Sequence, residues 1–98
     1  MFVAGDSLAA GAIRAFHEVG LQVPEDVSVV GCDDVDWAMY FNPPLTTVAV
    51  PMREIGEQAA ELFLHIVQEG SALSGHDGHR IVLKTRLMVR GSTARVRN

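Results

Sequence analysis

The 98-residue sequence has little of several things, and each shortage excludes a class of protein. No apolar run approaches the roughly 20 residues that cross a bilayer, so no membrane span is expected. Lysine and arginine number 8 against 12 acidic residues, for a net charge of −4. This balance excludes strong nucleic-acid binding by this segment, because phosphates are bound mainly by cationic side chains. The single cysteine, Cys32, excludes an internal disulfide, favours a small buried side chain and fits a reducing cytoplasm.

The N-terminus also lacks a secretory signal, which would need a basic start, a long apolar core and a cleavage site. Instead, Phe2, Val3 and Ala4 form a short extended run with nothing before it. A chain of this length forms at most one small domain with a modest core. We therefore expect the chain to begin inside a larger domain.

The first half of the sequence predicts a strand, a helix and a second strand. The helix spans about 7–19, with Asp6 or Ser7 as its cap and Gly20 at its end. The strand at 27–32 has valines on both parities, which is typical of a strand buried on both faces. A strand, helix and strand in this span predict an α/β fold with a parallel sheet and a right-handed βαβ crossover.

The second half of the sequence predicts a strand, a long helix and a final strand. Thr46, Thr47, Val48 and Val50 favour an extended strand. Pro51 suits a first helical position, and the sequence predicts a helix over 52–69. The final strand is expected over 80–89, after a polar loop. The apolar stripe of the long helix is formed by Ile55, Ala59, Leu62, Phe63 and Ile66.

An acidic trio, Asp33, Asp34 and Asp36, follows the strand at 27–32. Ligands of open parallel sheets bind beyond the carboxyl ends of the strands, where a carboxylate accepts hydrogen bonds from sugar hydroxyls or ring N–H groups. A second interpretation gives the trio to Mg²⁺, because hard cations prefer carboxylate oxygens. A third leaves Asp34 and Asp36 as caps of the next short helix.

Other candidate sites are weaker. His76, Asp77 and His79 do not have the spacing of a zinc site, so a solvated loop is the better interpretation. "GDSLAAG" follows a strand and opens a helix but lacks a third glycine and a lysine for phosphate. Trp37, Tyr40 and Phe41 are aromatic residues that either stack on a sugar or, as is commoner, pack in a core or subunit interface.

Three stretches together resemble the carboxyl-terminal part of the lactose-repressor/galactose-repressor family of bacterial transcription regulators. They read "DSLAAGAIRAFHEVGLQVPEDVSVVGCDD", "NPPLTTVAVPMREIGEQAAELFLHI" and "LMVRGST". The resemblance implies a fragment of a two-lobed, periplasmic-binding-protein-like (type I) core. Residues 1–47 and 82–93 would belong to the second lobe and 48–81 to the first, and the DNA-binding domain is absent from this chain.

The resemblance also implies site residues. The first aspartate after the "VVG" strand contacts the effector in that family, which assigns Asp33 to the ligand, together with the strand-to-helix turn at Gly5 and Asp6. Gly5 stands where an asparagine is common, and Cys32 where an aromatic is common. The first helix and the segment with Trp37, Tyr40 and Phe41 would form the dimer interface. The helix over 52–69 would pack on the first lobe, so self-association is expected where that lobe is missing.

The function expected from the resemblance is regulatory. The protein would bind a small sugar or nucleobase-like effector and control operator DNA through an N-terminal domain outside this chain, as a cytoplasmic homodimer. We expect the protein not to be an enzyme, and to use no cofactor, metal or membrane. The alternatives are a sugar-binding protein of a transporter, built on the same core, and a Mg²⁺-dependent phosphotransfer domain that uses Asp33, Asp34 and Asp36.

Overall fold

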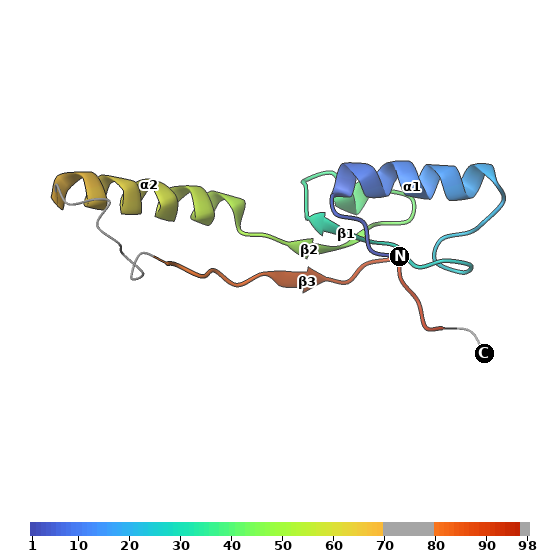
Figure 1. Cartoon of the computed structure of the whole chain (residues 1–98). Helices are drawn as coiled ribbons and strands as arrows, with labels where there is room; N and C mark the ends of the chain where they lie inside the picture. The colour runs from blue at the N-terminus through green and yellow to red at the C-terminus, as the bar shows by residue number, and fades with distance from the viewer. Residues whose placement is uncertain (70–79, 97–98) are drawn as a thin grey trace. The chain divides into compact units, whose positions relative to one another are not determined.

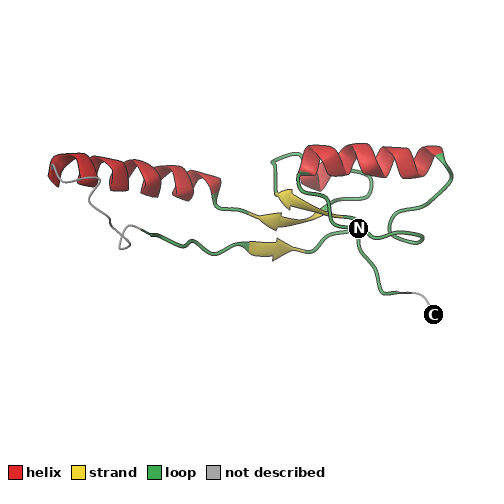
Figure 2. Ribbon diagram, in the orientation of Figure 1, coloured by secondary structure: helices red, strands yellow, loops and turns green. Residues whose placement is uncertain are grey.

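A computed structural model describes residues 1–69 and 80–96 of the chain (Figures 1 and 2). Two compact units share these residues. The sheet unit consists of Met1–Val50 and the segment from Thr85 onward, and the helix unit consists of Pro51–Lys84. Both boundaries lie within a few residues of the lobe bounds that the resemblance implies, after 47 and after 81. The assignment of the units to two lobes stays a prediction.

The sheet unit contains three strands in the order β1-β2-β3 (Figure 2). Strand β1 (Val30–Asp33) pairs in parallel with β2 (Thr46–Ala49), and β2 pairs antiparallel with β3 (Arg86–Met88). Helix α1 (Asp6–Glu18) precedes β1 in the chain. The predicted α/β class with a parallel β1–β2 pair is confirmed, while the antiparallel β3 makes the sheet mixed.

Four predicted strands are longer than the observed ones. The run at Phe2–Ala4 makes only an isolated parallel bridge between Phe2 and Val30. Strand β1 begins at Val30 rather than 27, and the N–H of Val29 before it donates to the carbonyl of Ser92 at 2.9 Å. The strand predicted over 80–89 is observed only as β3, and the strand predicted to reach Val50 ends one residue earlier, in β2.

Helix α1 supplies part of the core of the sheet unit. Ala9 and Ile13 from its apolar stripe are buried, and Val19 at its end is 72% exposed. Gly20 follows with φ +84, a left-handed conformation that glycine adopts at low cost and that ends the helix as predicted. The rest of the core comes from residues outside α1 and the strands, namely Val23, Val29, Ala38 and Leu45.

The N-terminal cap of α1 differs from the prediction. Gly5 occupies the cap position with an extended backbone, and no side chain caps the helix. Asp6 is instead the first helical residue, and its carboxylate forms hydrogen bonds elsewhere. A second predicted cap is also wrong. Neither Asp34 nor Asp36 caps the short 3-10 helix η1 (Ala38–Tyr40), whose cap position belongs to Trp37.

The C-terminal segment joins the sheet unit through a buried hydroxyl. Ser92 is fully buried, and its Oγ donates to the carbonyl of Val29 at 2.6 Å and accepts from the N–H of Thr46 at 2.8 Å. Buried polar groups need such partners, because an unpaired one costs about 1–3 kcal/mol. This serine therefore fixes residues that follow β3 against β1 and β2.

The helix unit contains α2 (Met52–Glu69), whose bounds match the predicted helix over 52–69. None of its residues is buried. Ile55 is 43% exposed and Phe63 is 64% exposed, although both belong to the predicted apolar stripe. A groove of about 550 Å³ in this unit is lined by Ile55, Gln58, Ala59, Leu62, Arg80, Ile81, Val82 and Leu83. Among residues 1–69 and 80–96, no helix combines the length and the apolar character needed to cross a bilayer.

Candidate functional site

Asp33 lies at the carboxyl end of β1, where it is the last residue in register with β2. Its backbone has φ +110, and Asp34 follows with φ +53. Residues other than glycine rarely adopt a positive φ, and they hold it only where their surroundings impose it. Asp33 is half-buried, so its carboxylate is neither enclosed in the core nor free on the surface.

Asp6 anchors the loop that follows Asp33. It is 1% exposed, and its Oδ2 accepts a hydrogen bond from the N–H of Val35 at 2.9 Å. Its Oδ1 accepts from the hydroxyl of Thr47 on β2 at 2.7 Å. The same hydroxyl accepts from the N–H of Asp34 at 3.3 Å. The start of α1 and the ends of β1 and β2 are therefore tied together at one edge of the sheet.

Arg90 holds the loop from its other side. Its guanidinium forms an ion pair with Asp34 at 2.9 Å, and both side chains are mostly buried, at 15% and 24% exposure. It also donates to the carbonyl of Leu45 at 2.9 Å. Its backbone N–H donates to the hydroxyl of Thr46 at 2.8 Å. Arg90 thus links the segment after β3 to the loop after β1.

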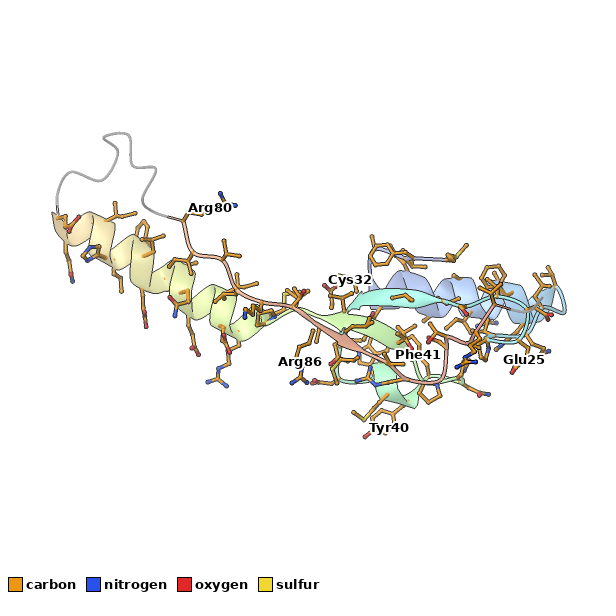
Figure 3. The ribbon with its side chains drawn as sticks, turned by 90° about the horizontal axis from the view of Figure 1, so that it is seen from below. Glu25, Cys32, Tyr40, Phe41, Arg80 and Arg86 are labelled. Atoms are coloured by element: carbon orange, nitrogen blue, oxygen red, sulfur yellow. The ribbon has the colours of Figure 1, made fainter. Side chains whose placement is uncertain are left out.

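Cys32 precedes Asp33 on β1 and is half-buried (Figure 3). Burial raises the pKa of its thiol, and the negative charges of Asp33 and Asp6 raise it further. A hydrogen bond from the thiol to the Asp33 side chain adds to the same effect. A thiol with a raised pKa is a poor nucleophile at neutral pH. Its environment places the Cys32 side chain beside the carboxylate of Asp33.

Gly5 lies directly before the buried Asp6, at the same edge. A Cβ built there would meet only the Cδ1 of Leu8, at 4.0 Å. Room for a side chain therefore exists at this position, although the sequence supplies none. Asp6 itself is an internal residue in the described structure, and both of its hydrogen-bonded partners are uncharged.

The three aromatic residues around η1 differ in their surroundings. The rings of Trp37 and Phe41 are tilted to each other with centroids 5.2 Å apart. Phe41 packs against the core, while Trp37 is 46% exposed and Tyr40 is 80% exposed. Tyr40 extends from the outer side of η1 in Figure 3. Nearby, Phe41 and Asn42 line an open groove of about 550 Å³ with Ala10, Ile13, Arg14, His17 and Glu18 of α1.

Metal ligation finds no support in the part of the chain that the structure describes. No group of three or more His, Cys, Asp or Glu side chains is placed to hold an ion there. Asp33, Asp34 and Asp36 follow one another in sequence without forming such a group, and Asp34 is paired with Arg90. His76, Asp77 and His79 lie outside the described residues.

Two residues of this edge, Thr47 and Arg90, carry no functional signal in the sequence. Thr47 belongs to a β-branched run that predicts a strand, and its hydroxyl has no evident task until β2 is paired with β1. Arg90 follows the last strand in "LMVRGST". A buried arginine near the end of a strand indicates a carboxylate partner, but 56 positions separate it from Asp34.

The chain matches the family model described as periplasmic binding protein-like domain over residues 1–93. It is similar to the HTH-type transcriptional repressor PurR of Vibrio vulnificus, with 33% identity over 96 residues, and to the ribose operon repressor of Escherichia coli, with 36% over 92 residues. These alignments cover 98% and 94% of this chain, but only 28% and 27% of the relatives. The chain thus spans about a quarter of their length.

A solved structure shows the same similarity in three dimensions. The LacI family transcriptional regulator of Enterococcus faecalis, solved with bound ribose, superposes with a TM-score of 0.86 at 35% sequence identity. The superposition covers 98% of this chain and 34% of that one. The two sequence relatives are transcriptional repressors, and the solved structure is of a transcriptional regulator, which does not favour a transport protein or a phosphotransfer domain.

Proposed function

The chain belongs to the periplasmic binding protein-like domain family, within its lactose-repressor/galactose-repressor branch, and from this premise we propose that it senses a sugar for a transcriptional repressor. The observation that carries the proposal is the placement of Asp33. It combines the carboxyl end of a parallel strand with a loop fixed by hydrogen bonds. Such strand ends are where open α/β sheets bind ligands.

The chemistry of Asp33 suits a polyol. An ionised carboxylate offers only acceptors, and hydrogen bonds to a charged acceptor are about twice as strong as neutral ones. Two neighbouring sugar hydroxyls present two donors at the spacing of its two oxygens. We propose that the effector is a small sugar, as in the ribose-bound relative, rather than a nucleobase-like compound.

Gly5 contributes to the same site through its lack of a side chain. The open space at this position leaves room for a sugar hydroxyl, and no side-chain donor competes for it. The effector is therefore oriented mainly by Asp33 at this edge. Asp6 was predicted to contact the ligand, but its burial and its two internal hydrogen bonds support an indirect role.

Regulation requires that the sugar favours one arrangement of the two lobes over another, since only differential affinity shifts such an equilibrium. We propose that the exposed Trp37 and Tyr40 and the groove beside α1 lie in a homodimer interface. We propose that operator DNA is bound by a domain outside this chain, that the protein acts in the cytoplasm and that it makes or breaks no covalent bond.

On this proposal, the uncovered face of α2 packs on the first lobe, and a chain without that lobe self-associates through it.

The test is calorimetric binding of D-ribose, D-galactose, D-glucose and cellobiose to the protein at its natural full length. One of these sugars should bind, and Asp33→Asn should weaken its binding about tenfold or more, because a hydrogen bond to a charged group contributes about 1.5–3 kcal/mol. Asn tolerates the positive φ, so the melting temperature should change little. Asp36→Asn, at an exposed carboxylate of the same loop, is the control. Binding of none of the sugars, or unchanged binding by Asp33→Asn, would contradict the proposal.

A further inference from the structure

Asp33 and Asp34 hold a backbone conformation that their side chains disfavour. Their φ angles are +110 and +53, two successive non-glycine residues in the region that glycine normally occupies. Such residues keep this conformation only when neighbouring groups fix it. The direction in which the chain leaves β1, and so the position of Asp33, depends on the groups that bind the loop after it.

Two of these groups come from other elements. The carboxylate of Asp6 accepts from the N–H of Val35 at 2.9 Å, and the hydroxyl of Thr47 accepts from the N–H of Asp34 at 3.3 Å. Thr47 also donates to Asp6 at 2.7 Å, so the two anchors fix each other. Both residues are buried, at 1% and 0% exposure. The two amides directly after Asp33 are thereby attached to α1 and to β2.

The sequence of β1 leaves space for this arrangement. A Cβ at Gly31 would overlap the Oδ1 of Asp6 and would come within 2.9 Å of the Cδ2 of Leu45. Any larger residue at Gly31 would therefore displace the carboxylate from Thr47. A glycine two positions before Asp33 allows the carboxylate of α1 to lie against the strand itself.

Helix capping does not account for Asp6. An aspartate beside the start of a helix ordinarily accepts from an unpaired N–H of the first turn. The cap position of α1 is Gly5, and no side chain caps it. Instead, its Oδ1 accepts from the hydroxyl of Thr47, and its Oδ2 accepts from the N–H of Val35 in the loop after Asp33. The buried carboxylate therefore binds the loop rather than its own helix.

We propose that Asp6 and Thr47 are positioning residues for effector binding, which hold Asp33 in the orientation that meets the sugar. The inference rests on the proposed function, in which Asp33 binds the effector. Neither residue touches the sugar in this account. Their contribution is preorganisation, since a side chain that is already oriented loses less freedom on binding.

The test uses substitutions that differ only in the hydroxyl of Thr47. Thr47→Val keeps the shape and removes the hydroxyl, while Thr47→Ser keeps the hydroxyl. In the protein at natural full length, and with the sugar of the four-member panel that binds, Thr47→Val should lower affinity about tenfold and Thr47→Ser less than about twofold. Asp6→Ala and Asp6→Asn form the second pair, because Asn keeps an acceptor for the Val35 N–H.

A double-mutant cycle separates positioning from general destabilisation. In an Asp33→Gly background there is no carboxylate to orient, and glycine adopts the positive φ freely. Thr47→Val should then change sugar affinity by less than about twofold, although it lowers the melting temperature by as much as in the parent. Thr47→Val would thus lower sugar affinity only when Asp33 is present, while it lowers the melting temperature equally in both backgrounds. A purely structural role does not produce this combination.

The outcomes separate this inference from the proposed function. If Asp33→Gly weakens sugar binding while Thr47→Val leaves it unchanged, the positioning role is wrong and the function stands. Equal losses from Thr47→Val in both backgrounds would also refute positioning. If Asp33→Gly leaves binding unchanged, the proposed function fails and the positioning role fails with it. Should Asp6→Ala not fold, the Thr47 pair carries the test unaided.

Discussion

Helices α1 and α2 carry similar apolar stripes, but only α1 is covered. Ala9 and Ile13 of α1 are buried in the core of the sheet unit, whereas α2 has no buried residue and Phe63 remains 64% exposed. A helix gains most of its stability from packing an apolar face, so the sheet unit is stabilised from within. The helix unit has no such buried helix face in the described residues. The difference fits a chain that spans about a quarter of its relatives.

The largest expected effect contrasts one substitution in the two helices. Ile13→Ala, at 5% exposure in α1, should lower the free energy of unfolding by about 2–5 kcal/mol because it empties a packed site. Ile55→Ala, at 43% exposure in α2, should change it by less than about 1 kcal/mol at protein concentrations where this chain is a monomer. Urea denaturation followed by circular dichroism measures both.

A large cost for Ile55→Ala that does not depend on protein concentration would break this contrast. It would mean that residues of the helix unit itself already cover the face of α2. Sedimentation at several concentrations shows where the chain is a monomer. A self-associated chain would show a cost for Ile55→Ala that grows with protein concentration.

The second effect contrasts ion pairs. Arg90→Ala removes a mostly buried guanidinium from Asp34 and from the carbonyl of Leu45, and should cost about 1–3 kcal/mol of unfolding free energy. Arg53→Ala removes an exposed pair with Glu57 on α2, and should cost about 0.5 kcal/mol or less. Thermal melts in low and high salt provide the readout, since salt should weaken only the exposed pair. Equal costs for the two variants would contradict the role given to Arg90.

The smallest effect concerns Cys32. Because its thiol pKa is raised, the thiolate fraction at pH 8 is lower than for free cysteine, and alkylation by iodoacetamide should be slower. Asp33→Asn removes one of the charges that raise this pKa, so it should speed the reaction. Asp36→Asn should not. Mass spectrometry of the Cys32 peptide over time measures the rates. Equal rates for the two variants would show that the charge of Asp33 does not raise the pKa of the Cys32 thiol.

The sequence predicts the elements better than their partners. The bounds of α2 and the placement of Asp33 after a buried strand follow from periodicity and from the position of the acidic trio. The partners of Asp6 do not follow, because an aspartate at the start of a helix reads as a cap. Its actual partners are 29 and 41 positions away. Such long-range hydrogen bonds depend on how α1 lies against β1 and β2, which no local pattern encodes.

The edge at Asp33 can be tested most directly by hydrogen–deuterium exchange of the full-length protein with and without the sugar that binds. We expect the sugar to slow exchange in peptides that cover residues 30–38, where Asp33 and its anchored loop lie. Peptides from the groove beside α1, around residues 10–18, should change less. Protection confined to the groove residues, with none at 30–38, would contradict the account and move the effector away from Asp33.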